Sequence, residues 1–173
     1  IRTQGDLQLI AGQDLNLRAA SLTSQAGALQ ALAGRDLTLT AGQATTQLDE
    51  AHQHKGHSGS GSAIVRSTQT QQDNSTAQGS TITGRNISLG AGNNVLLEAA
   101  TVNAQNTLAI QAGNNIFLAT AENQQNLQHV ESTIKKQTLS LGTKSLTETT
   151  HSERITQVGS TLRGQDITLV AGQ

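Results

Sequence analysis

The chain has 173 residues, 11 Lys or Arg, 12 Asp or Glu and a formal net charge of −1. It contains one Phe and no Trp, Tyr, Met, Cys or Pro, and only 34% of its residues are hydrophobic, which excludes a rounded aromatic core. The sequence has neither a basic stripe nor stacking aromatics, which excludes a nucleic-acid partner. No apolar run approaches the roughly 18 residues of a membrane-spanning helix.

The first part of the chain contains two similar units. GDLQLIAGQDLNLRAASLTSQ begins at Gly5, and GALQALAGRDLTLTAGQ begins 22 positions later at Gly27. Apolar residues alternate within each unit, as at Leu15 and Leu17, and Gly, Asn and Asp bound the alternating stretches. Period two over short stretches is typical of strands. Three short strands and three corners need about 20 residues, so each unit is predicted to form one coil of a parallel β-helix.

Residues 43–78 break this pattern. The segment is rich in Thr, Gln, Ser and His, and its centre is rich in glycine, with Gly56, Gly59 and Gly61. Its arms alternate Thr with Gln, which predicts a long β-hairpin with a flexible tip. A disordered low-complexity loop is the alternative, because such loops have a similar composition.

Three histidines, His52, His54 and His57, lie close together in this first insert. In a strand His52 and His54 point to one face, and with His57 at the turn they could bind a divalent metal or act as a pH-sensitive patch. The competing interpretation, solvated side chains of a hairpin, is favoured, because no nearby acid shares their face. We therefore expect neither a metal site nor a cofactor.

The middle of the chain repeats the coil pattern with an offset of 21 residues. AGNNVLLEAATVNAQ begins at Ala91 and AGNNIFLATAENQ at Ala112. Stacked coils would place Asn93-Asn94 above Asn114-Asn115 as short amide ladders. Phe117 replaces an aliphatic residue in one strand and is predicted to lie in the core.

Glycines recur at one corner of the predicted coils. Gly12, Gly34, Gly92 and Gly113 each precede Gln, Arg or Asn and then Asp or Asn. This set of residues tolerates a positive φ angle or caps a turn through its own side chains. Turn chemistry is therefore the expected role of these positions.

A second insert and a longer period complete the pattern. GSTITGRNISLGAG at residue 79 returns as GSTLRGQDITLVAG at residue 159, 80 positions later. Subtracting one insert from the 80-residue period leaves about 42 residues, which is two coils. Two stacked coils advance along the helix axis by the same distance that the two strands of a hairpin occupy side by side. Successive hairpins are therefore predicted to pair into a flanking sheet. We expect a fragment of a longer all-β helix with coils at 1–42, 79–120 and 159–173 and inserts at 43–78 and 121–158.

The units AGQDLNLRA, AGRDLTLTAG, GRNISLGAGNNVLLEA and GQDITLVAG, interrupted by Thr/Gln-rich inserts, resemble the haemagglutinin repeats of filamentous-haemagglutinin-type exoproteins. The later repeats of contact-dependent growth inhibition toxin-delivery proteins are the most similar. The resemblance implies a right-handed parallel β-helix in a large secreted protein of the bacterial surface. It also implies export by a partner outer-membrane β-barrel transporter.

An enzyme is not expected. The acidic residues are scattered, and Asp6, Asp14, Asp36 and Asp166 occupy the same corner in their units, which indicates repetition rather than a site. A carbohydrate-active β-helix enzyme remains the alternative, because such enzymes share the fold. It would require a non-repeating cluster of acids and sugar-stacking aromatics, which the sequence lacks.

The inserts are the predicted binding surface. Long, weakly charged edges rich in Thr and Gln suit β-augmentation, self-association or glycan contact. Together with the resemblance, they predict a structural and interaction module that associates with a target-cell outer membrane or a surface glycan. A passive stalk spacer is the remaining alternative.

Overall fold

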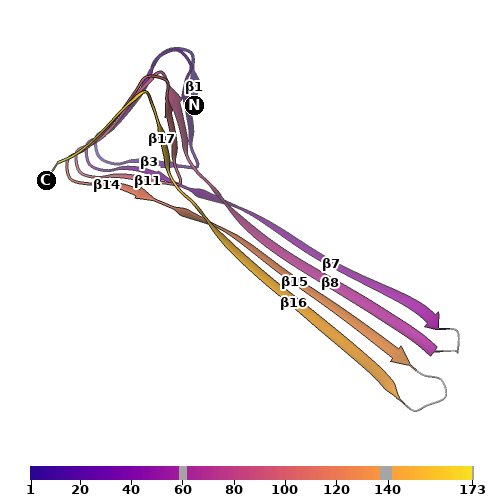
Figure 1. Cartoon of the computed structure of the whole chain (residues 1–173). Coiled ribbons are helices and arrows are strands. Elements are labelled where there is room, and N and C mark those ends of the chain that lie inside the picture. The colour runs from indigo at the N-terminus through magenta and orange to yellow at the C-terminus, as the bar shows by residue number, and fades with distance from the viewer. Residues whose placement is uncertain (59–61, 137–141, 173) are drawn as a thin grey trace. The chain divides into compact units, whose positions relative to one another are not determined.

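The computed structural model describes residues 1–58, 62–136 and 142–172, and their regular secondary structure consists of strands (Figure 1). The chain divides into two compact units. The hairpin unit comprises residues 45–76 and 123–156, and the coil unit comprises 1–44, 77–122 and 157–173.

The coil unit contains three parallel sheets, in each of which every strand named below pairs with the next one. Sheet 1 contains β1 (Arg2–Thr3), β4 (Ser21–Ser24), β9 (Thr81–Gly84), β12 (Thr101–Ala104) and β17 (Thr161–Arg163). Sheet 2 contains β2 (Leu7–Ala11), β5 (Ala28–Ala33), β10 (Asn86–Ala91), β13 (Thr107–Ala112) and β18 (Asp166–Ala171). Sheet 3 contains β3 (Leu15–Arg18), β6 (Leu37–Thr40), β11 (Val95–Glu98) and β14 (Ile116–Ala119).

The chain visits the three sheets in rotation, which confirms the predicted parallel β-helix. β1, β2 and β3 lie in sheets 1, 2 and 3, and the next strands return to the same sheets in the same order. Leu7 pairs with Leu29, 22 positions later, and Ile87 pairs with Leu108, 21 positions later. The alternation of apolar residues found in the sequence therefore sets both the strands and their register.

Stacked aliphatic residues form the core of the coil unit. In sheet 3, Leu17, Leu39, Leu97 and Leu118 are aligned by register and form one inward column. Leu39 and Leu97 of this column are fully buried. All three sheets supply further fully buried large side chains, which are Leu22, Leu29, Leu37, Ile82, Ile87, Leu89, Val95, Val102, Leu108 and Ile110. Each such side chain contributes roughly 1.5–3 kcal/mol, and only when coils are stacked on it.

Polar ladders run along the corner between sheets 2 and 3. Asn114 donates to the Asn93 side chain, and Asn115 Nδ2 donates to Asn94 Oδ1 at 3.2 Å, which confirms the predicted amide ladders. Asp36 Oδ1 accepts from the Asn94 backbone N–H at 3.0 Å. These side chains satisfy polar groups that the turn would leave unpaired.

Three of the four corner glycines are required by close packing between coils, whereas a Cβ on Gly12 would meet no atom within 4 Å. A Cβ on Gly34 would lie 2.2 Å from the Gly12 carbonyl oxygen, and one on Gly92 would lie 2.2 Å from that of Gly34. Gly113 approaches Gly92 in the same way, and none of the four has φ in the left-handed region. At Gly34, Gly92 and Gly113 the nearest backbone atom belongs to the preceding coil, so the prediction of a positive φ angle was wrong. The predicted capping by side chains is confirmed, because Asp14 and Asp36 accept from backbone N–H groups of the turns.

The left-handed conformation occurs instead at the corner between sheets 3 and 1. Ala19 (φ 46°) and Ala99 (φ 47°) make this turn in alternate coils. In the other coils the chain leaves for a hairpin here and returns through Ser80 or Ser160. The buried Ser80 hydroxyl accepts from the Ala20 N–H at 3.1 Å and lies 3.2 Å from the Thr40 carbonyl, to which it can donate. Ser160 repeats this arrangement at Ala100 and Ala119.

The hairpin unit is a four-stranded sheet, the hairpin sheet, with strand order β16–β15–β8–β7. Its strands are β7 (Gly42–Ser58), β8 (Ser62–Gln78), β15 (Ala121–Lys136) and β16 (Thr143–Val158). β8 and β15 run antiparallel from Gln124 opposite Ser75 to Lys136 opposite Ala63, which confirms that the two hairpins pair edge to edge. The expected flexible tips at 59–61 and 137–141 lie outside the described residues.

The two units differ in how they are held together. Of the described side chains in residues 45–76 and 123–156, none is buried, whereas the aliphatic core lies in the coil unit. The hairpin sheet therefore depends on backbone pairing and cross-strand side-chain contacts.

Candidate functional site

The three candidate metal ligands lie on β7 and do not converge. β7 continues to Ser58, so His57 lies within the strand rather than at a turn. Alternation along the strand puts His52 and His54 on one face and His57 on the other. An acid does share the face of His52 and His54, contrary to the sequence prediction, because His52 Nε2 lies 3.9 Å from Glu50 Oε2. No group of three or more His, Asp or Glu placed to hold a metal occurs in the described parts of the chain.

The corner acids serve the fold, but they occupy two corners and not the single one predicted. Asp6 and Asp166 lie where the strands of sheet 2 begin, and Asp14 and Asp36 precede strands of sheet 3. Asp6 Oδ1 accepts from the Ala28 N–H at 2.8 Å, across to the next coil. Asp14 accepts from the Arg35 guanidinium, and this hydrogen bond lowers the pKa of the Asp14 carboxyl below its ordinary value. These acids are thus engaged in hydrogen bonds between successive coils, as expected for side chains that stabilise turns.

Phe117 is not in the core, contrary to the sequence prediction. It pairs with Leu96 on the outer face of sheet 3, because the inward positions of β14 belong to its neighbours in the strand. Phe117 is 51% exposed and borders a shallow hollow of about 360 Å³, lined also by Asp14, Asn16, Asp36, Thr38, Asn94 and Leu96. In a strand of only four residues, alternation alone did not determine whether Ile116 and Leu118 or Phe117 and Ala119 would face the core.

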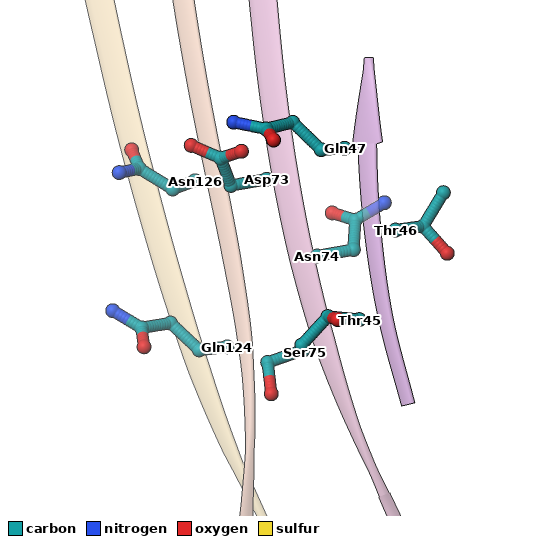
Figure 2. Close-up of a pocket in the computed structure, with 8 residues that line it drawn as sticks. All are labelled: Thr45, Thr46, Gln47, Asp73, Asn74, Ser75, Gln124 and Asn126. Atoms are coloured by element: carbon teal, nitrogen blue, oxygen red, sulfur yellow. The ribbon is translucent and has the colours of Figure 1, made fainter. Parts of the chain in front are cut away.

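A polar hollow of about 340 Å³ lies on the hairpin sheet, lined by Thr45, Thr46, Gln47, Asp73, Asn74, Ser75, Gln124 and Asn126. Figure 2 shows the Asp73 carboxylate between the side chains of Asn126 and Gln47. Asp73 and Asn126 are directly opposite each other in the β8–β15 pair. Sequence reasoning missed this hollow, because its residues lie far apart in the chain.

The chemistry of the polar hollow is that of hydrogen-bond acceptance. Oδ1 of Asn74 and Oδ1 of Asn126 are buried and have no hydrogen-bond partner among the described atoms. Asp73 supplies the single carboxyl group of the lining. Glycoside hydrolysis normally needs two carboxyl groups. The hollow can therefore contact a polar partner but does not provide an acid pair.

Four cations gather where the described strands of the hairpin sheet end. We call residues 63–66, 133–136 and 143–146 the basic tip. It contains Arg66, Lys135, Lys136 and Lys144 and no acidic residue. Arg66, Lys135 and Lys144 border one hollow of about 680 Å³ that reaches across β8, β15 and β16.

Aliphatic side chains are interleaved with these cations. Lys135 is paired with Ile64, and Ile134 is paired with Val65. Leu146 is 70% exposed on β16. Glu131 Oε1 lies 3.8 Å from Arg66 Nε, and none of the three lysines forms an ion pair within the described residues. The basic tip is thus both cationic and apolar.

Comparisons with known proteins agree with this repeat architecture. A family model described as Hemagglutinin repeat matches residues 58–173, about two thirds of the chain. No curated protein and no solved structure gives a match. In the described residues, no helix has the length and apolar character needed to cross a membrane. The chain therefore belongs to the hemagglutinin repeat family, as a structural repeat of the kind found in secreted adhesin-like proteins.

Proposed function

We propose that the chain is an interaction segment of a large secreted bacterial surface protein and that its hairpin sheet associates with an anionic outer-membrane surface. The observation that carries the proposal is the basic tip. Four cations without an intervening acid, mixed with half-buried aliphatic side chains and the exposed Leu146, match the phosphate and acyl parts of a lipid interface.

The binding free energy expected of the basic tip is that of a weak contact, which gains strength when it is repeated. Each Lys or Arg close to an anionic membrane contributes about 1 kcal/mol. Four cations therefore give about 4 kcal/mol, which alone corresponds to a dissociation constant of about 1 mM. Because the architecture repeats, several hairpins on one protein raise the overall affinity by avidity.

Family membership supports the cellular setting of the proposal. Hemagglutinin repeats suggest a secreted protein exported with a partner outer-membrane transporter. We further propose that the parent protein is either an adhesin or a contact-dependent inhibition protein that delivers a toxin. Membrane association by the hairpin sheet serves both purposes, since each needs prolonged contact with another cell.

Vesicle binding tests the proposal. Flotation with phosphatidylglycerol vesicles is compared with flotation on phosphatidylcholine vesicles, for the unmodified chain and for the triple variant Lys135→Gln, Lys136→Gln, Lys144→Gln. We expect binding to the anionic vesicles that weakens with salt, and a loss of about a hundredfold in the variant, at roughly 1 kcal/mol per lysine.

A matched control removes the same charge from the coil unit. Arg2, Arg85 and Arg163 are exposed and are changed to Gln together. This control should retain most of the binding. Equal losses in the two variants would show that net charge, not the basic tip, causes binding. If the folded chain does not bind anionic vesicles, the proposal is wrong and the chain is a passive spacer.

A further inference from the structure

The four cations of the basic tip do not all lie on one face of the hairpin sheet. Thr133 is directly opposite Arg66 in the β8–β15 pair. Directly opposed residues share a face of the sheet, and so do residues two apart on one strand. Arg66 and Lys135 are therefore on the same face, whereas Lys136, the neighbour of Lys135, is on the other.

Lys144 of β16 belongs to the face of Arg66 and Lys135. Thr147 Oγ1 donates to Ser132 Oγ at 3.3 Å, which places these two side chains together on the opposite face. Lys144 is three residues from Thr147, so strand alternation puts it on the other side of the sheet from Thr147. The three cations of this face also border the same hollow of about 680 Å³. We call Arg66, Lys135 and Lys144 the phosphate face.

Three cations around one hollow suit a terminal phosphate group. A phosphate monoester carries a charge of about −1.5 to −2 at pH 7 and offers three acceptor oxygens. The Arg66 guanidinium can donate two parallel hydrogen bonds to such a group, and each lysine ammonium supplies a further donor. A phosphodiester has less charge and fewer free oxygens. We propose that the phosphate face binds the terminal phosphate monoester of a lipid headgroup, an inference that rests on the proposed membrane association and adds selectivity among anionic lipids.

Apolar side chains beside the phosphate face favour a lipid over a free phosphate ion. Leu146 borders the same hollow and is 70% exposed. Ile64 is directly opposite Lys135 and shares its face. An acyl chain can bury apolar surface against these side chains, whereas inorganic phosphate gains nothing from them.

One acid competes with the phosphate group for the phosphate face. Glu131 Oε1 lies 3.8 Å from Arg66 Nε, and the two side chains are 45% and 61% exposed. An ion pair this exposed to solvent is weak. A phosphate monoester, with its larger charge, can therefore displace the carboxylate from Arg66. Glu131→Gln removes the competitor and should raise the affinity for the monoester.

Two anionic lipids with different headgroups test the proposal. Phosphatidylcholine vesicles containing phosphatidic acid, a monoester, are compared with vesicles containing phosphatidylglycerol, a diester. The lipid fractions are adjusted until both vesicles have the same electrophoretic mobility, so that general charge attraction is equal. We expect a dissociation constant about tenfold lower for the monoester, because hydrogen bonds to a charged group add to the screened attraction.

Lys135→Gln and Lys136→Gln are the matched variants. They remove the same charge from adjacent, exposed residues, but only Lys135 lies on the phosphate face. Lys135→Gln should abolish the preference for phosphatidic acid, whereas Lys136→Gln should keep the preference and weaken binding to both lipids equally. Arg66→Lys keeps the charge but not the paired donors, so it should reduce the preference.

A titration in solution separates a lipid headgroup from a free phosphate ion. Amide signals of the phosphate face are followed by NMR while either dihexanoyl phosphatidic acid, below its micelle-forming concentration, or inorganic phosphate is added. The short-chain lipid should bind about tenfold more tightly, because it also contacts the neighbouring apolar side chains. Equal affinities would overturn the assignment to a lipid.

The outcomes distinguish this inference from the proposed function. Equal binding of the two kinds of vesicle, with equal losses in Lys135→Gln and Lys136→Gln, would overturn the phosphate face and leave membrane association intact. If soluble phosphatidic acid binds at the phosphate face but no vesicle is bound, the proposed function is wrong and the phosphate face stands.

Discussion

Single glycines decide how closely successive coils approach. A Cβ on Gly92 would lie 2.2 Å from the Gly34 carbonyl oxygen, a backbone atom that cannot rotate away. Gly92→Ala should therefore lower the free energy of unfolding by about 1–3 kcal/mol, the usual cost of overpacking. Urea denaturation followed by circular dichroism measures this change.

Gly12→Ala is the control for this substitution. Gly12 occupies the equivalent corner, but a Cβ there meets no atom within 4 Å. Its stability should stay close to that of the unmodified chain. If both variants lose the same stability, the corner requires glycine for its own conformation, and close packing between coils is not the cause.

Residue roles were the part of the fold that the sequence predicted least well. The repeated Gly and Asn positions indicated corners correctly, and the stacked amides of Asn94 and Asn115 followed from the 21-residue offset. The carbonyl contact at Gly34 could not be predicted, because it depends on the height of one coil above another. Phe117 was misplaced because a four-residue strand allows either face to point inward.

Strands of the coil unit are stabilised by their neighbours on both sides. Leu97 has no exposed surface, and in its column it lies between Leu39 and Leu118. Leu97→Ala should cost about 2–5 kcal/mol of unfolding free energy, because it removes a packed side chain and leaves a cavity. The change is measured from urea denaturation curves.

Leu118 provides the comparison within the same column. It is 54% exposed, because β14 has a partner on one side only in the described sheet. Leu118→Ala should therefore cost about 1 kcal/mol or less. Equal costs at the two positions would contradict a core built by stacking and would indicate that each coil is stable by itself.

Elements were predicted well where a local period defined them. Alternation, the 21–22-residue offset and the 80-residue period together predicted the strands, the parallel sheets and the pairing of hairpins. The basic tip was not predictable in this way. Its cations at Arg66, Lys135 and Lys144 come from three strands, and in the sequence they appear as scattered charges.

The whole chain combines a unit with a core and a unit without one. β10 lies in the coil unit and supplies the buried side chains of Ile87 and Leu89 to its core. β15 lies in the hairpin sheet, where no described side chain from 123 to 136 is buried. Regions with few buried contacts open more easily. Hydrogen exchange followed by mass spectrometry should therefore be slower for residues 86–91 than for residues 124–131.

The exchange experiment has an internal reference. β8 and β15 are central in the hairpin sheet and β16 is at its edge, so protection should fall from the central pair to β16. Uniform exchange across both units would contradict separate opening, and would mean that the chain unfolds as one cooperative body.

The stack of corner glycines gives the coil unit a direction. Gly34 is limited by the carbonyl of Gly12, Gly92 by that of Gly34, and Gly113 by that of Gly92, and the dependence does not run the other way. Each coil thus supplies the surface on which the following coil is fitted. If the chain folds from its amino-terminal side, each coil is already in place when the glycine that packs against its carbonyl oxygen folds. Coils can then be added in order without rearranging those already formed.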